Sequence, residues 1–446
     1  MPAARTRTQA RIPTRIQTQI QTRTDAAAGL PTPRAGQGHA SPARGVAGRL
    51  GRGVARLAAA AGLLALAACA TGSDRAATPD APSSPSAPAA PSTPVTGPVP
   101  VALLLPLGAA EERDAASARA IENGARLALQ GAGGSAVRLS VIDTRGTPEG
   151  ATSAANTAIA GGARLILGPL FGRNASAVAG PAGAAGINVL SLSTDVTVAG
   201  PPVWITGFTP SDEVDRILGY AAGRGIQRLG VYAPDIPYGN AALEAARRLA
   251  PRHGIALVAA ESYPRSFRDI ERTAPLFAEA ARASGADAVL LPDFGQGLTT
   301  ASTYVDFVGL PQPGVRYLGI GQWEAPATLR EPTLTGGWFA GADVGAVDAF
   351  ARRYSARYGE RPPFLAVLGH DVALIAATLA EEARRSRGAD PFSAAALTRE
   401  TGFAGAVGAI RLLPDGTVRR GLAVLEVGQG RFAVLDPAPV RFAAGL

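Results

Sequence analysis

A short apolar run, Val101-Ala102-Leu103-Leu104-Leu105, ends at Pro106. A continuous apolar run of this length is typical of a strand that is buried on both faces of a parallel sheet. Strands and helices are then expected in alternation, with helices at 114–130, 148–160 and 174–185 and strands at 137–143, 164–167 and 187–192. This alternation predicts an α/β fold with a doubly wound parallel sheet.

The alternation resumes after 203–208, where the chain is expected to cross into a second unit. Its predicted strands are 228–233, 256–263, 288–292 and 317–320, and its helices lie near 211–223, 239–252, 267–283 and 297–308. A return strand at 338–340, helices near 346–358 and 365–386, and short strands at 406–413, 422–427 and 432–435 complete the prediction. Two lobes are therefore expected, one formed by 99–207 plus about 337–400 and the other by 208–336 plus about 401–446. Because ligands of open parallel sheets bind beyond the carboxyl ends of the strands, a cleft between the lobes is the predicted site.

The basic charge of the chain lies almost entirely before residue 69. The net charge is +8, but residues 1–68 hold ten arginines and one aspartate, which leaves 33 arginines against 34 acidic residues in the remainder. A near-neutral body has no electrostatic footprint for a phosphate backbone, so nucleic acid is not an expected partner.

Residues 1–68 have the pattern of a leader with a lipoprotein signal peptide. An apolar run over 57–68 follows three arginines and is shorter than the ~20 residues that span a bilayer. It ends in Leu66-Ala67-Ala68-Cys69, which resembles a lipobox and implies lipidation of Cys69, the only cysteine. Ala70 follows in place of an aspartate, which favours the periplasmic side of the outer membrane, with inner-membrane anchoring as the alternative. Residues 69–98 are rich in proline and predict an extended tether.

Six motifs mark the body of the chain: Leu103-Leu104-Leu105-Pro106-Leu107, Ile166-Leu167-Gly168-Pro169-Leu170, Ser191-Leu192-Ser193-Thr194-Asp195, Phe208-Thr209-Pro210-Ser211-Asp212, Tyr238-Gly239 and Gly369-His370-Asp371. Together they resemble the type 1 periplasmic binding fold of branched-chain amino-acid binding proteins over about 99–441. The resemblance implies two Rossmann-like lobes joined by a multi-strand hinge. The loops at 168–173 and 191–195, together with the tether, most resemble the penicillin-binding protein activator lipoproteins. Unlike the best-known activators, this chain has no helical-repeat domain before the fold.

Ten candidate ligand-binding residues follow the predicted strands or lie at the crossing between lobes: Arg173, Ser191, Ser193, Thr194, Phe208, Tyr238, Asp293, Gln296, Gln322 and Trp323. Arg173 and the hydroxyl groups suit a carboxylate, although a solvated helix start and a helix cap are the alternatives. Asp293 and Gln296 suit an ammonium or hydroxyl group. Trp323 suits stacking on a ligand, Tyr238 suits closure over it, and Phe208 suits either hinge packing or ligand contact.

Catalysis is not expected, and no cofactor is predicted. The body has two histidines, His253 and His370, far apart in the sequence, and no lysine for a Ser-x-x-Lys nucleophile. One cysteine and these histidines give no recognisable metal-ligand spacing.

Two functions fit this pattern. The first is a non-catalytic envelope lipoprotein that activates a penicillin-binding protein and so regulates peptidoglycan synthesis. The alternative is the substrate-binding lipoprotein of an ABC transporter for branched-chain or other amino acids, with an ABC permease as its partner. A transport receptor needs polar groups that converge on a small polar ligand, whereas an activator needs only a surface that faces a protein.

Overall fold

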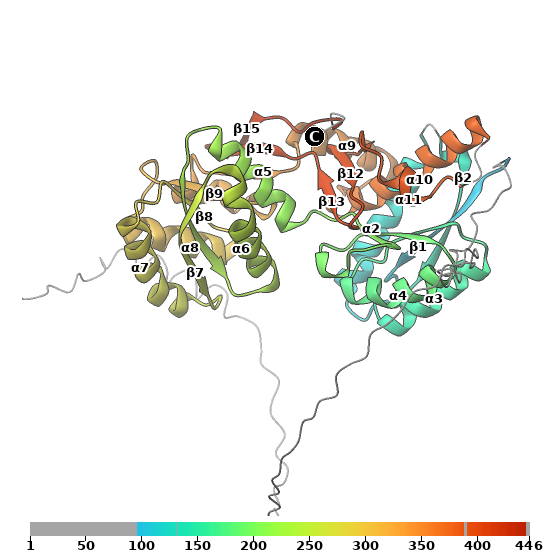
Figure 1. Cartoon of the computed structure of the whole chain (residues 1–446), viewed down its shortest axis with the longest axis horizontal. Coiled ribbons are helices and arrows are strands. Elements are labelled where there is room, and N and C mark those ends of the chain that lie inside the picture. Colours follow the sequence, from blue (N-terminus) through green and yellow to red (C-terminus); the bar gives the residue numbers. More distant parts are fainter. Residues whose placement is uncertain (1–95, 132, 388–389, 443–446) are drawn as a thin grey trace, which may run out of the picture. The chain divides into compact units, whose positions relative to one another are not determined.

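The strands of the computed structural model form three sheets (Figure 1). The structure describes residues 96–131, 133–387 and 390–442. The predicted signal peptide, the lipidation site Cys69 and nearly all of the tether lie outside these ranges. Within these ranges, no helix combines the length and apolarity that crossing a bilayer requires.

The first sheet has five strands in the order β2-β1-β3-β4-β5, all parallel. Its strands are β1 (Val99–Leu105), β2 (Val137–Asp143), β3 (Leu165–Leu167), β4 (Asn188–Ser191) and β5 (Val203–Ile205). The apolar run of β1 serves two cores, because successive side chains of a strand point to opposite faces. Leu103 and Leu105 belong to one core and Ala102 and Leu104 to the other.

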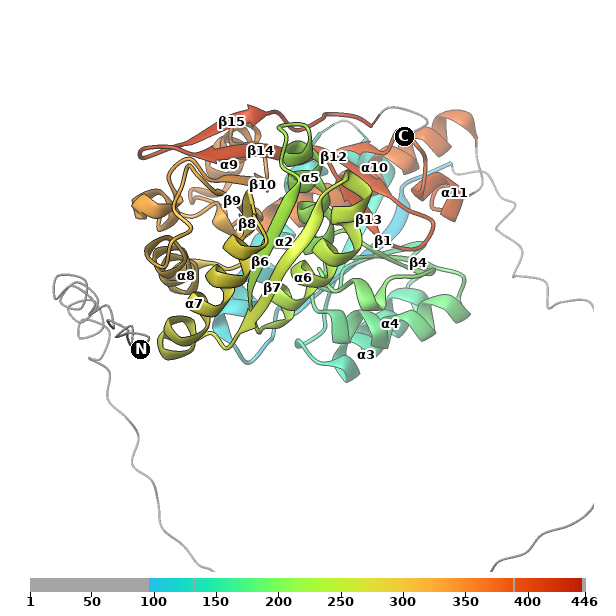
Figure 2. The same ribbon diagram turned by 60° about the vertical axis from the view of Figure 1, so that its left-hand side comes forward.

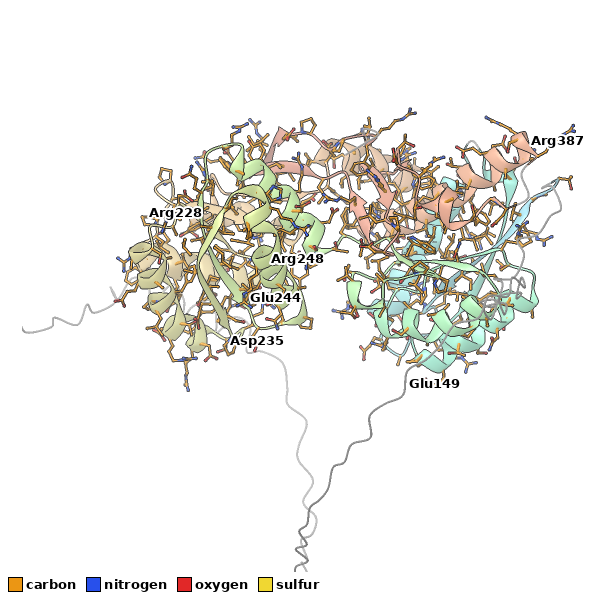
Figure 3. The ribbon with its side chains drawn as sticks, viewed as in Figure 1. Glu149, Arg228, Asp235, Glu244, Arg248 and Arg387 are labelled. Atoms are coloured by element: carbon orange, nitrogen blue, oxygen red, sulfur yellow. The ribbon has the colours of Figure 1, made fainter. Side chains whose placement is uncertain are left out.

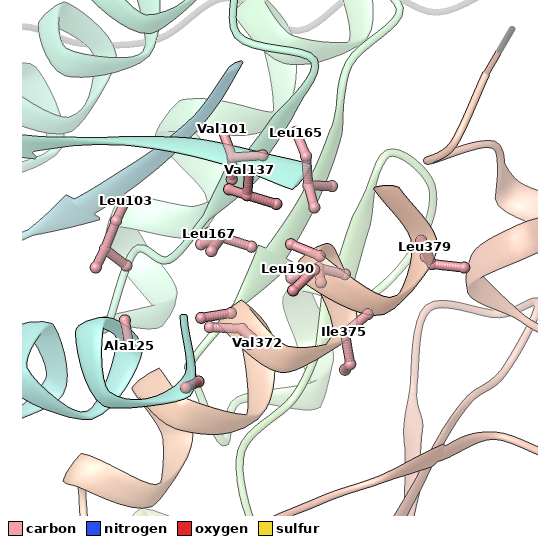
Figure 4. Close-up of a cluster of buried hydrophobic side chains, with 14 of the residues drawn as sticks. Val101, Leu103, Ala125, Val137, Leu165, Leu167, Leu190, Val372, Ile375 and Leu379 are labelled. Carbon is pink, nitrogen blue, oxygen red and sulfur yellow. The ribbon is translucent and has the colours of Figure 1, made fainter. Parts of the chain in front are cut away.

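Helices cover both faces of this sheet. On one face lie α2 (Glu112–Ala128) and α10 (Ala366–Ser386), whose Ala125, Val372 and Ile375 pack against strand side chains (Figure 4). Gly124 lets these two helices touch, because a Cβ atom there would lie 2.0 Å from the carbonyl oxygen of Ala366. The other face is covered by α3 (Pro148–Ala160) and α4 (Gly172–Ala184).

The second sheet has seven strands in the order β15-β14-β10-β9-β8-β6-β7. Five are parallel: β6 (Arg228–Pro234), β7 (Ala256–Tyr263), β8 (Ala288–Leu290), β9 (Arg316–Gly319) and β10 (Trp338–Gly341). Of the last two, β14 (Ala423–Val427) runs antiparallel to β10, and β15 (Phe432–Asp436) pairs antiparallel with β14 at the edge of the sheet (Figure 2). One face is covered by α5 (Pro210–Ala222) and α6 (Pro237–Leu249), and the other by α7 (Phe267–Ala283) and α8 (Gly295–Phe307).

The chain passes between the two sheets at other residues than those predicted. The strand β10 was expected with the first lobe but pairs with β9 and β14 of the second sheet. After it, α9 (Val344–Tyr358) and α10 pack on the first lobe, followed by the short helix α11 (Ala394–Leu397). The third sheet, formed by β11 (Phe403–Ala404), β12 (Ala409–Leu412) and β13 (Val418–Arg420), was expected with the second lobe. Its apolar side chains, Ile410 and Leu412 among them, instead pack in the core of the first.

The chain makes a further crossing after β15. The backbone N–H of Ala409 in β12 donates to the carbonyl oxygen of Pro439 at 2.9 Å. The segment after the last strand of the second sheet therefore returns to the third sheet.

Candidate functional site

The carboxyl edge of the first sheet is formed by the loops that follow β3 and β4. The first loop turns sharply at Gly168, whose φ is 83°. A Cβ atom there would lie 2.3 Å from the carbonyl oxygen of Leu104, so only glycine fits. This turn places Gly172 and Arg173 in the first turn of α4, where helix N–H groups have no partner within the helix.

The second loop carries the predicted hydroxyl residues in three different settings. Ser191 is buried, donates to the carbonyl oxygen of Pro169 at 3.2 Å and so ties the two loops together. Ser193 is also buried, and its Oγ accepts from the N–H of Asp195 at 3.0 Å. Thr194 is exposed. The structure therefore places Ser193 and Thr194 at the rim and gives Ser191 a loop-joining contact.

Arg173 points toward a third loop. Its Nη2 donates to the carbonyl oxygen of Gly146 at 3.1 Å, and its guanidinium lies 4.8 Å from the ring centroid of Phe171. Arg173 is exposed, so these contacts orient the charge without burying it. Its predicted pairing with a ligand carboxylate stays a prediction.

Asp195 was not among the predicted site residues, yet it lies against the start of α4. Its Oδ1 accepts from the N–H and the hydroxyl of Thr197 at 2.9 and 2.6 Å. Its Oδ2 lies beside Gly172, where a Cβ atom would be 2.8 Å from that oxygen. Asp195 is the last residue of the Ser191–Asp195 motif, so the sequence did point to it. The motif does not show in which direction the Asp195 side chain points.

The side chain of Asn174 in the same helical turn is completely buried. Neither its Nδ2 nor its Oδ1 has a hydrogen-bond partner in the described part of the chain. Side chains of a helix lean toward its N-terminus, so this amide is directed to the same end of α4 as Asp195.

At the carboxyl edge of the second sheet, the predicted acidic residue is buried. Asp293 is 0% exposed and accepts from the hydroxyl of Tyr263 at 2.7 Å, from Nε of Arg265 at 2.8 Å and from the N–H of Phe294 at 2.7 Å. Arg265 also stacks on Phe294, 4.0 Å from the ring centroid. Asp293 was predicted to meet an ammonium or hydroxyl group of a ligand, but its carboxylate instead accepts hydrogen bonds from groups within the protein. The exposed acid at this edge is Asp235, which follows β6 (Figure 3).

The prediction for Trp323 is wrong, because its ring is 0% exposed in the second core. Its Nε1 donates to the carbonyl oxygen of Leu291 at 2.9 Å, so no polar atom is left for a ligand. Gln296 and Gln322 are exposed beside the ends of β8 and β9, as their sequence positions suggested.

Tyr238 is half-buried and donates from its hydroxyl to Oε2 of Glu213 at 2.9 Å. Burial raises the pKa of Glu213 to about 8, so this carboxyl is largely protonated at neutral pH. Burial and the neighbouring Glu213 charge raise the pKa of Tyr238 well above its usual value. Glu213 was not among the predicted site residues, because its place in the first turn of a helix does not distinguish a site residue from an ordinary helix residue.

The crossing between the sheets is built around Phe208 and Arg420. The Arg420 guanidinium lies 4.0 Å from the Phe208 ring centroid, and its Nη1 donates to Asp371 at 2.7 Å. Burial alone would raise the pKa of Asp371, but the charge of Arg420 holds it below the usual value. Nε of Arg420 also donates to the carbonyl oxygen of Thr206 at 3.0 Å, and Phe364 packs on Phe208 with ring centroids 5.0 Å apart. Phe208 therefore packs between Arg420 and Phe364 at the crossing, and whether it serves as hinge or ligand contact stays a prediction.

The chain belongs to the periplasmic binding protein family, whose model matches residues 98–431. This match and the two parallel sheets confirm the predicted type 1 periplasmic binding fold. Comparison with curated proteins finds no match. In the described residues, no group of three or more histidine, cysteine, aspartate and glutamate side chains is placed to hold a metal ion.

Solved structures with the same fold are similar over nearly their whole length. A putative branched-chain amino acid ABC transporter protein from Rhodospirillum rubrum is 22% identical with a TM-score of 0.65, covering 76% of this chain and 100% of its own. An ABC transporter substrate-binding protein from Sphaerobacter thermophilus is 20% identical, with a TM-score of 0.60 and coverage of 78% and 100%. One from Desulfitobacterium hafniense, in complex with Leu, is 20% identical, with a TM-score of 0.55 and coverage of 76% and 99%.

Proposed function

We propose that this chain is the non-catalytic solute-binding component of an ABC transporter and takes up a small polar molecule, such as an amino acid, in the periplasm. The observation that supports this most is the family match over residues 98–431, which includes the first sheet and every strand of the second sheet except β15. A receptor of this kind needs two lobes that close on a ligand through a hinge. The Phe208–Arg420 cluster is the candidate hinge, and the carboxyl edges of the two sheets are the candidate ligand surfaces.

Polar groups at both edges support this proposal. The first edge offers the hydroxyls of Ser193 and Thr194 beside the N-terminus of α4. The second offers the exposed amides of Gln296 and Gln322 and the aromatic side chain of Tyr238. These groups suit a ligand with hydrogen-bonding capacity at both ends. Family members from Desulfitobacterium hafniense and Rhodopseudomonas palustris were solved with Leu and with benzoate, which sets the size of the ligands to test.

The test is thermal unfolding of the full chain with a panel of amino acids and small carboxylates, followed by calorimetric titration. A ligand that binds only the folded state at 100 times its Kd adds about 2.7 kcal/mol to the free energy of unfolding, which is easily seen as a rise in Tm. Recovery of an ABC permease with the chain from solubilised envelope would add support. The absence of any shift across the panel would contradict the proposal.

Activation of a penicillin-binding protein is the second candidate. It is favoured by the resemblance of the loops at 168–173 and 191–195 to those of activator lipoproteins and by the predicted lipid anchor at Cys69 on the outer membrane. Retention of a bifunctional penicillin-binding protein by the full chain, together with stimulation of its glycan synthesis in a purified assay, would replace the transport proposal by this one.

A further inference from the structure

The two loops at the carboxyl edge of the first sheet enclose the position at which the sequence predicted a ligand carboxylate. The side chain of Asp195 lies at this position, and a Cβ atom on Gly172 would come within 2.8 Å of its Oδ2. That oxygen makes no hydrogen bond within the described residues, while Oδ1 is fixed by Thr197. One oxygen of a held carboxylate is thus available at the start of α4.

A carboxylate is favoured at this place by the helix itself. The N-terminus of a helix carries partial positive charge and attracts an anion. Here the anion is part of the protein, and a second carboxylate would meet a like charge at short range. The buried amide of Asn174, unpartnered and in the same turn, shows that hydrogen-bonding capacity remains at this end of α4.

Arg173 does not neutralise Asp195 by a direct contact. Its guanidinium is directed to Gly146 and to the ring of Phe171. No ion pair joins Arg173 to Asp195 in the part of the chain that the structure describes. The charge of Asp195 is therefore exposed, two residues after Ser193 and next to Thr194 in the sequence.

We propose that Asp195 sets the ligand preference of this edge, so that the ligand presents an N–H donor, an ammonium or an amide, to the first lobe and a carboxylate there is disfavoured. This inference rests on the proposed function and deepens it by naming the chemical group that the first lobe receives. The apolar side chains of Leu107, Leu170 and Phe208, which are partly buried and pack against the core between the first sheet and α2 and α10, suit an aliphatic remainder.

The experiment uses three molecules with one carbon skeleton and the full chain. They are 3-methylbutanamide, 3-methylbutylamine and 3-methylbutanoate, which present a neutral N–H donor, a cation and an anion. We expect the amide or the amine to bind about tenfold or more tightly than the carboxylate, a moderate factor because the charge of Asp195 is exposed and screened. The difference should narrow as salt is added.

Asp195→Asn removes the charge and keeps an acceptor for Thr197. It should weaken binding of the amine and strengthen binding of the carboxylate, each by about tenfold, because a neutral donor replaces Oδ2. The amide should change less, since it can turn its own carbonyl oxygen toward that donor. Asp415→Asn is the matched control, because Asp415 accepts from the N–H and hydroxyl of Thr417 at 2.9 and 2.6 Å, the same local cap in another turn. This control should leave all three affinities unchanged.

Tightest binding of the carboxylate to the unmodified chain, or equal effects of Asp195→Asn and Asp415→Asn, would overturn the inference. If none of the three molecules binds but an amino acid from the panel does, and Asp195→Asn does not change that affinity, the inference fails and the proposed function stands. If neither the three molecules nor the panel binds, the proposed function itself fails.

Discussion

Asp195 and Asp293 both follow parallel strands at the carboxyl edge of their sheets, but the two carboxylates are used in opposite ways. Asp293 is 0% exposed and has hydrogen bonds from Tyr263, Arg265 and Phe294. Asp195 is exposed, and its Oδ2 has no hydrogen bond in the described residues. A position after a strand therefore does not by itself make an acid available to a ligand. A nearby cation and hydroxyl can donate hydrogen bonds to its carboxylate oxygens first.

The largest expected effect is at the second edge, where Trp323 follows β9. Trp323→Ala should lower the free energy of unfolding by about 4 kcal/mol, because it removes a fully buried ring and leaves a cavity. Urea denaturation of the full chain measures this. Gln322→Ala is the control, since its exposed side chain should change stability by less than about 0.5 kcal/mol. Similar small losses for both variants would return Trp323 to the group of ligand-facing candidates.

The next prediction concerns the stability lost when Asp293 or Asp195 is replaced. Asp293→Asn should cost about 3 kcal/mol of stability, because it leaves Arg265 and Tyr263 around a neutral amide in a buried place. Asp195→Asn should cost less than about 1 kcal/mol, the usual size of a charge–helix interaction at an exposed site. Equal losses in the same denaturation experiment would contradict the distinction between the edges.

A pH dependence follows from Glu213. Its folded-state pKa of about 8 lies above the ordinary value of 4.5, so the folded chain keeps a proton that the unfolded chain releases between these two pH values. Stability from this group is thus present below about pH 4.5 and is lost as the pH rises to about 8. Glu213→Gln should reduce this decline in Tm between pH 5 and 9, and Asp212 and Glu324, whose pKa values burial raises to about 7, should cause the part that remains. Glu149→Gln, at an exposed acid, should leave the decline as it is. An unchanged decline in Glu213→Gln would show that another group causes it.

A small effect on stability is expected at the rim of the first edge. Ser193→Ala removes one hydrogen bond, to the N–H of Asp195, and should cost about 1 kcal/mol. If this edge receives the ligand, the same variant should weaken binding of the best panel ligand several-fold, measured by calorimetric titration. Full retention of affinity would move the ligand away from Ser193.

Much of the fold was predictable because its signals are local. The apolar run of β1 and the bounds of α3 and β7 follow from apolar pattern and, for α3, from the Thr147-Pro148 start, where Thr147 accepts from the N–H of Gly150 at 3.0 Å. The strand β10 and the third sheet were assigned to the wrong lobes, because short apolar strands carry no local record of the sheet that they join. Pairing with β9 and packing of Ile410 on the first core decide this, and both depend on residues far away in the sequence.

The candidate site was less predictable for the same reason. Thr194, Gln296 and Gln322, which were predicted from their positions near strand ends, are exposed, and their contact with a ligand stays a prediction. Strand-end position could not show that Arg265 neutralises Asp293 from 28 residues away. It also could not show that Trp323 turns into the core, because an aromatic residue after a strand fits either environment.

The repeated passage of the chain between the sheets has a consequence for its synthesis. Residues 403–420 complete the first core, and residues 423–436 add two strands to the second sheet. Neither lobe can therefore finish folding until the last part of the chain has left the ribosome. Partners such as Trp204 and Leu413, or Arg216 and Asp436, are 209 and 220 residues apart. Chains whose contacts are this distant fold slowly, and their apolar surfaces stay open until translation ends. A nascent chain stalled before residue 400 should therefore be held by chaperones as two unfinished lobes, with neither one released as a folded domain.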